Sequence, residues 1–147
     1  MSRARRLSAL KTLHRVQYLG VEQAGRELAE RAERHDIARA AHAAAVARIE
    51  SEAGFAAAAL STAPVPREEL SDFALWLPAG RSAVTAAQAA AAAAEAEALQ
   101  ARAALLAART AVRATELLLD RHHAETLSEQ ERRAQAVIDE LALRARR

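Results

Sequence analysis

An all-α fold is predicted for this 147-residue sequence, with two long helices forming an antiparallel coiled-coil hairpin and a short helix near the bend. Three observations lead to this prediction. The hydrophobic fraction is 52%, but alanine supplies most of it and aromatic residues only 3%, so the side chains favour long helices over a bulky core. Apolar residues recur every seven positions in both halves of the chain. Only four glycines and three prolines are present, so few turns are encoded.

The first long helix is predicted over residues 5–60. One position of its seven-residue repeat holds Leu7, His14, Val21, Leu28, His35, His42, Ile49 and Ala56. The companion position holds Leu10, Gln17, Ala24, Arg31, Ala38 and Ala45. Together they form the stripe of a coiled-coil seam. The helix is expected to end before a cluster of helix-breaking residues, namely Ser61, Thr62, Pro64 and Pro66.

A bend with a short helix is predicted over residues 61–80. Pro66 suits the first turn of a helix, and Leu70, Phe73 and Leu77 follow at helical spacing. The segment Pro78-Ala79-Gly80 is expected to end this helix.

The second long helix is predicted over residues 82–146. Its register holds Val84, Ala91, Ala98, Leu105, Val112 and Leu119, and then Leu127, Ala134 and Leu141 after a phase slip of one residue. Two helices of comparable length joined by a bend predict a hairpin with both chain termini at one end. We therefore expect residues 1–147 to form a single elongated coiled-coil domain.

Catalysis and cofactor binding are not expected. The chain has no cysteine, and its glycines, at positions 20, 25, 54 and 80, do not form a phosphate-binding loop. His14, His35 and His42 share one seam position without the paired carboxylates that a di-metal bundle needs. A two-helix structure also offers no cleft for a small-molecule substrate. We expect a protein that is not an enzyme and that binds no cofactor or metal.

A cytoplasmic protein is expected. The basic start of the chain is not followed by an apolar signal segment, and the longest uncharged runs are too short to span a bilayer. The net charge is only +2, with 21 basic and 19 acidic residues.

Two candidate partner-binding surfaces stand out. The first is a basic foot where the two ends of the chain would converge, comprising Arg3, Arg5, Arg6, Lys11, Arg144, Arg146 and Arg147. Its alternative is a solvated end of the stem. The second is an apolar tip at the bend, with Phe73, Trp76 and Leu77. Its alternative is a cap that closes the coiled coil. Nucleic acid is not expected at the foot, because no aromatic residues accompany the arginines.

The layout resembles the FliJ family of small flagellar export proteins, which has YscO-type counterparts in injectisomes. The features that carry this resemblance are a basic N-terminal helix, a bend helix with the pattern F-x-x-x-L (Phe73 and Leu77), and a closing charged helix with an Asp-Glu pair (Asp139 and Glu140). The tip helix of that family usually continues into the second long helix, whereas Pro78 and Gly80 predict an interruption here.

The resemblance implies a stalk-like coupling factor of a type III export apparatus. Its terminal end would contact a hexameric export ATPase, and its tip would contact an export gate protein or export chaperones at the inner membrane. Two alternatives remain open: a generic coiled-coil scaffold or adaptor, and a helical protein associated with nucleic acid.

Overall fold

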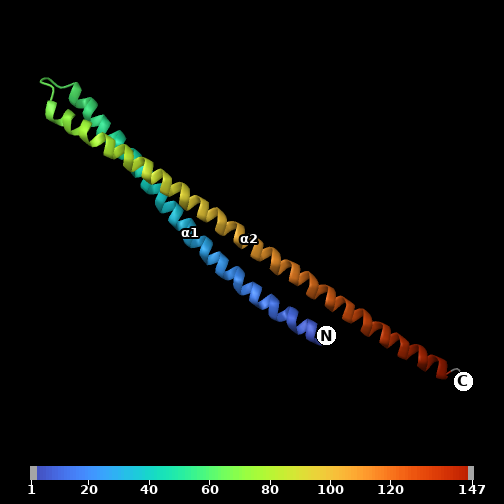
Figure 1. The fold of residues 1–147 in the computed structure, drawn as a ribbon. Coiled ribbons are helices and arrows are strands. Elements are labelled where there is room, and N and C mark those ends of the chain that lie inside the picture. The colour runs from blue at the N-terminus through green and yellow to red at the C-terminus, as the bar shows by residue number, and fades with distance from the viewer. Residues whose placement is uncertain (1–2, 146–147) are drawn as a thin grey trace. The chain divides into compact units, whose positions relative to one another are not determined.

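Two α-helices make up nearly all of the structure, a computed structural model that describes residues 3–145 (Figure 1). Helix α1 spans Arg3–Leu60 with 58 residues, and helix α2 spans Arg67–Ala145 with 79 residues. The two helices pack against each other, and no strand occurs between residues 3 and 145. The predicted all-α hairpin is thus confirmed. Neither helix, over its described residues, contains an apolar stretch of the length that a bilayer requires.

The two helices run antiparallel. Gln17 of α1 contacts Thr115 of α2, Arg31 contacts Glu97, and Arg48 contacts Trp76. Residues later in α1 therefore meet residues earlier in α2. Residues 61–66 connect the helices, and the chain leaves α1 through a turn in which the Ser61 amide donates to the Ala58 carbonyl at 3.0 Å.

The chain divides into two compact units. The terminal unit comprises residues 1–24 and 105–147, and the bend unit comprises residues 25–104. Each unit contains a stretch of both helices. The terminal unit holds 13 basic and 8 acidic residues, whereas the bend unit holds 8 basic and 11 acidic residues. The nearly neutral chain is therefore the sum of a basic unit and an acidic one.

The seam follows the predicted heptads. Every predicted seam residue of α1, from Leu7 to Ala56, is at least partly buried. The predicted positions of α2 from Val84 to Leu119 are also at least partly buried. The heptad pattern therefore identified the face along which α1 and α2 pack in each unit.

Burial along this seam is shallow. Among residues 3–145, the only buried ones are Ala59, Gly80, Val112 and Thr115. No described side chain is completely buried. The accessible surface of 11455 Å² is about one and a half times what a compact protein of 15.8 kDa leaves exposed, roughly 7,300 Å². Much of the helical stability must therefore come from the high helix propensity of alanine.

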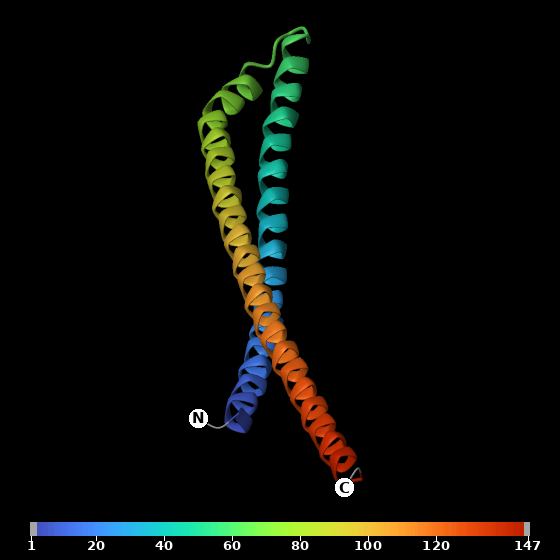
Figure 2. The same ribbon diagram turned by 90° about the vertical axis from the view of Figure 1, so that its right-hand side faces the viewer.

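The prediction of a separate short helix before Gly80 is wrong. Helix α2 begins at Arg67 and continues through Pro78. Proline lacks an amide hydrogen, so it removes one helical hydrogen bond and bends the helix without ending it when packing on both sides continues. Phe73, Leu77 and Gly80 lie on the same seam as the later residues of α2. The first turns of α2 (green) lie at an angle to the turns that follow (Figure 2).

The predicted phase slip at Leu127 is also wrong. Thr126 and Glu129 are partly buried and extend the original register, whereas Leu127 is 60% exposed. The reason lies in where α1 begins. Gln17 lies opposite Thr115, so Arg3, fourteen positions earlier, lies opposite Glu129. Beyond this point no residue of α1 that the structure describes lies beside α2, and every residue from 130 to 145 is exposed. We call residues 130–145 the overhang; Figure 1 shows it running past the start of α1.

Candidate partner-binding surfaces

The predicted tip residues contribute to packing between the helices. Phe73, Trp76 and Leu77 are all half-buried, and Phe73 and Leu77 lie on the seam. The rings of Phe73 and Trp76 are tilted by 34°, with their centroids 6.3 Å apart. These contacts give the three side chains a structural role in addition to the partner binding predicted for them.

Trp76 is held between the two helices. The guanidinium carbon of Arg48, on α1, lies 5.4 Å from the centroid of the indole ring, a cation–π geometry. A methyl group added at Gly80, on α2 itself, would lie only 2.7 Å from Cη2 of Trp76. Gly80 therefore provides the space that the indole ring occupies.

Substituting Gly80 with alanine is expected to displace Trp76. The added methyl group cannot be accommodated at 2.7 Å, so the indole ring must turn away and release Arg48. Alanine improves helix propensity by about 1 kcal/mol, which offsets part of the strain of about 1–3 kcal/mol. Trp76 is the only tryptophan, so a red shift of its fluorescence would report the displacement.

Gly54→Ala is the matched control, because nothing lies within 4 Å of the methyl group that it would add. It should raise the melting temperature and leave the fluorescence unchanged. An unchanged emission spectrum in Gly80→Ala would show that the ring does not depend on this space.

Two shallow grooves flank Trp76 on the surface of the bend unit. The first, of about 450 Å³, is lined by Arg48, Glu52, Phe55, Ala56, Ala59, Glu69, Asp72, Phe73 and Trp76. The second, of about 470 Å³, is lined by Ala44, Ala45, Arg48, Trp76, Ala79, Gly80 and Ala83. The first groove combines aromatic rings with three carboxylates, and the second is lined mainly by alanine.

The most exposed apolar side chains near the bend were not among the predicted tip residues. Phe55 is 69% exposed, Leu75 is 78% exposed and Leu60 is 61% exposed. The heptad pattern could have identified these three residues as exposed. Each lies outside the seam stripe of the helix that carries it.

The N-terminal part of the predicted basic foot lies on the first turns of α1. Arg5, Arg6 and Lys11 are exposed, and no acidic residue occurs in the sequence before Glu22. Cations in the first turn of a helix face the positive end of its dipole, and α1 has no acid there to compensate. Helix stability therefore does not explain the position of these cations. The side chain of Arg3 and the residues Arg146 and Arg147 lie outside the described part of the structure.

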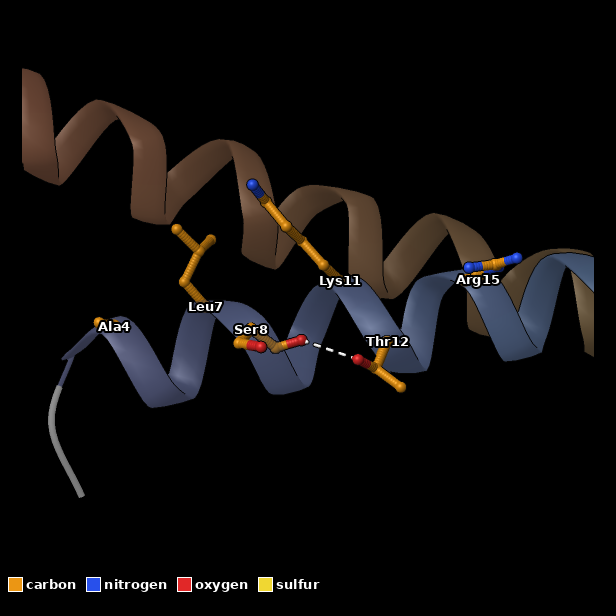
Figure 3. Close-up of a pocket in the computed structure, with 6 residues that line it drawn as sticks. All are labelled: Ala4, Leu7, Ser8, Lys11, Thr12 and Arg15. Carbon is orange, nitrogen blue, oxygen red and sulfur yellow. Dashed lines mark hydrogen bonds between the residues drawn. The ribbon is translucent and has the colours of Figure 1, made fainter.

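A groove of about 500 Å³ lies among these basic residues (Figure 3). It is lined by Ala4, Leu7, Ser8, Lys11, Thr12 and Arg15. Leu7 and Lys11 extend toward α2, and the Thr12 hydroxyl donates to the Ser8 carbonyl at 3.1 Å. The start of α1 thus presents an apolar residue between cations.

Arg144 does not join these residues. It lies fifteen positions beyond Glu129, the residue opposite the start of α1, which is about 22 Å along the helix. It donates to Glu140 at 2.5 Å. The expected convergence of the two basic groups is therefore wrong for Arg144. The reason is the unequal length of the two helices.

The overhang is amphipathic. Leu127, which precedes it, lies on the same helical face as Ala134, Ile138 and Leu141. We call these four residues the overhang stripe. Leu127, Ile138 and Leu141 are 60%, 58% and 59% exposed.

Several polar residues of the overhang pair with residues one turn away along the helix. Arg133 donates to Glu129 at 2.6 Å, and Gln135 donates to Asp139 at 2.9 Å. Such pairs at a spacing of four residues stabilise a helix surface. In contrast, no helix among residues 3–145 packs against Ala134, Ile138 and Leu141 of the overhang stripe.

Polar contacts fix the pairing of α1 and α2 in the terminal unit. The buried Thr115 hydroxyl donates to Oε1 of Gln17 at 2.7 Å. Nearby, Nε2 of His14 lies 3.5 Å from Glu116. A hydrogen bond from Arg113 and a weaker contribution from His14 lower the pKa of Glu116. A polar layer of this kind favours one register over others.

Comparisons of this chain with protein-family models, curated proteins and solved structures gave no match. Within residues 3–145, no three histidine, aspartate or glutamate side chains come together in a way that could hold a metal ion.

Proposed function

We propose that this chain is a non-enzymatic coupling factor of a flagellar-type type III export apparatus. Its terminal end would contact a hexameric export ATPase, and its tip would contact an export gate protein or export chaperones. The protein would act in the cytoplasm, peripheral to the export apparatus at the inner membrane. The proposal rests on the resemblance to the FliJ family and on the surfaces at the two parts of the hairpin.

The overhang is the observation that supports this proposal best. Sixteen residues of α2 extend past the start of α1, and the overhang stripe is exposed along them. Exposed apolar stripes of this kind are found where a helix docks on a partner. A coupling factor that inserts one end into an ATPase ring needs such a helix.

The charge of the terminal unit also supports a contact between the terminal end and the ATPase. The unit carries five more basic than acidic residues, and Arg6, Lys11 and Arg15 make no ion pair with another described residue. A positive end accelerates association with a negatively charged opening, and salt weakens this effect.

The first test is ATPase stimulation. The purified chain is expected to raise the turnover of a hexameric export ATPase from the same cell. The double variant Arg6→Glu, Lys11→Glu should need about tenfold more protein for half-maximal stimulation, since it reverses the steering field. The difference in half-maximal concentration between this variant and the unaltered chain should decrease as ionic strength rises.

The double variant Arg34→Glu, Arg39→Glu is the control, because it changes the net charge equally on exposed residues of the bend unit. It should stimulate normally. If both variants lost stimulation equally, the loss would be explained by net charge and not by a contact at the basic foot. If no ATPase responded and the basic end bound duplex DNA with a steep salt dependence, the nucleic-acid alternative would replace this proposal.

A further inference from the structure

The two grooves of the bend unit share part of their lining, and we call them together the trough. Both are lined by Arg48 and Trp76, which lie where the grooves meet. Along α1 the trough runs from Ala44 to Ala59, about 22 Å at the rise of an α-helix. That length accommodates a helix of about four turns.

Three carboxylates line one end of the trough. Glu69 lies in the first turn of α2, where a negative charge favours the helix dipole. Glu52 and Asp72 have no such role. None of the three forms an ion pair with another residue of the described chain. The three carboxylates outnumber Arg48, the one cation that lines the same groove, and Phe55 beside them is 69% exposed.

The trough already holds one guanidinium group. Arg48 of α1 lies over the face of Trp76, 5.4 Å from the ring centroid. The chain itself therefore shows that an arginine side chain fits against this aromatic floor, beside the carboxylates that line the same groove.

We propose that this trough binds a cationic amphipathic helix of a partner protein. Leucine-like side chains would pack on the apolar floor formed by Phe55, Phe73 and Trp76. Arginine or lysine side chains of the partner would pair with Glu52, Glu69 and Asp72. At the other end, the small exposed residues Ala79 and Ala83 would let the partner helix approach closely.

The choice of a cationic occupant follows from charge. The bend unit carries three more acidic than basic residues, so an acidic helix would be repelled. The inference rests on the proposed function only in naming this occupant as part of the export machinery. The binding itself requires no other export component.

The test uses Trp76 as its reporter, because it is the only tryptophan of the chain and lies in the trough. The probe is a synthetic 16-residue peptide with leucine at every third or fourth position and arginine on both flanks, without aromatic residues. A second peptide carries glutamate in place of each arginine. Titration of the full chain with the arginine peptide should change the Trp76 fluorescence saturably. The affinity should fall at least tenfold between low and high salt.

Two triple variants decide the site. Glu52→Gln, Glu69→Gln, Asp72→Asn removes the trough carboxylates and should weaken binding at least tenfold. Glu30→Gln, Glu33→Gln, Glu95→Gln removes the same charge from exposed positions outside the trough and should weaken it less than twofold. Circular dichroism confirms that both variants keep their helices.

Equal weakening in both triple variants would overturn the proposal, since it would show general electrostatic attraction. Equal binding of the glutamate peptide would also overturn it, since charge would then play no part. Either result would leave the ATPase test unaffected. Conversely, a failure of the unaltered chain to stimulate any export ATPase would leave the peptide result standing.

Discussion

Replacing Ile138 and Leu141 together with glutamine is expected to weaken ATPase stimulation about a hundredfold while leaving the hairpin intact. Both side chains lie on the overhang stripe and are more than half exposed. Burial of one such side chain against a partner contributes about 1.5–3 kcal/mol, so losing both costs roughly 3 kcal/mol or more of binding. The protein concentration that gives half-maximal stimulation measures the effect.

The matched control for the overhang replaces Leu106 and Leu143 with glutamine. These leucines are as exposed as the stripe residues, at 67% and 66%, but they lie on other faces of α2. The control should stimulate normally, and neither variant should lower the melting temperature by more than a few degrees, because exposed side chains contribute little to folding. Full stimulation by the Ile138→Gln, Leu141→Gln variant would show that the overhang stripe does not contact the ATPase.

The substitution Val112→Asp is expected to separate α1 from α2 in the terminal unit. Val112 is only 8% exposed and lies on the seam. A carboxylate in that position loses its hydration without gaining a partner, at a cost of several kcal/mol. The shallow seam contributes little free energy to offset this cost. The melting temperature should therefore fall by about 10 °C or more.

Amide hydrogen exchange locates this effect. Residues 3–24 should lose protection, while residues 25–60 of the bend unit should keep theirs. Leu106→Asp places the same carboxylate on an exposed face of the same helix and should change neither measurement. Uniform protection in Val112→Asp would show that this seam position does not hold the terminal unit together.

The sequence predicted the seam well because heptads record which residues are withdrawn from water. Positions from Leu7 to Ala56 and from Val84 to Leu119 needed only this rule. Continuation of α2 through Pro78 depended on tertiary packing instead. Trp76 rests against Gly80, and the seam residues on both sides of the proline stay in one register. Local propensity alone predicts a break there.

The heptad pattern also failed to predict that residues 130–145 lack a partner helix, for a related reason. A heptad repeat at Leu127, Ala134 and Leu141 looks like a continuing seam, but a sequence pattern does not show whether a partner helix is present. The starting point of α1 decides this, and it follows from the pairing of Gln17 with Thr115. The same pairing explains why Arg144 lies apart from Arg6 and Lys11.

The pairing of Gln17 with Thr115 also determines how far α2 extends past the start of α1. Removing seven residues from α2 ahead of Thr115 would keep every later seam residue facing α1, yet it would shorten the overhang by about 10 Å. Removing three or four residues would instead turn the seam away from α1. Deletions ahead of Thr115 that preserve the seam therefore shorten the reach of α2 in steps of about 10 Å, and each step replaces the partner of Gln17.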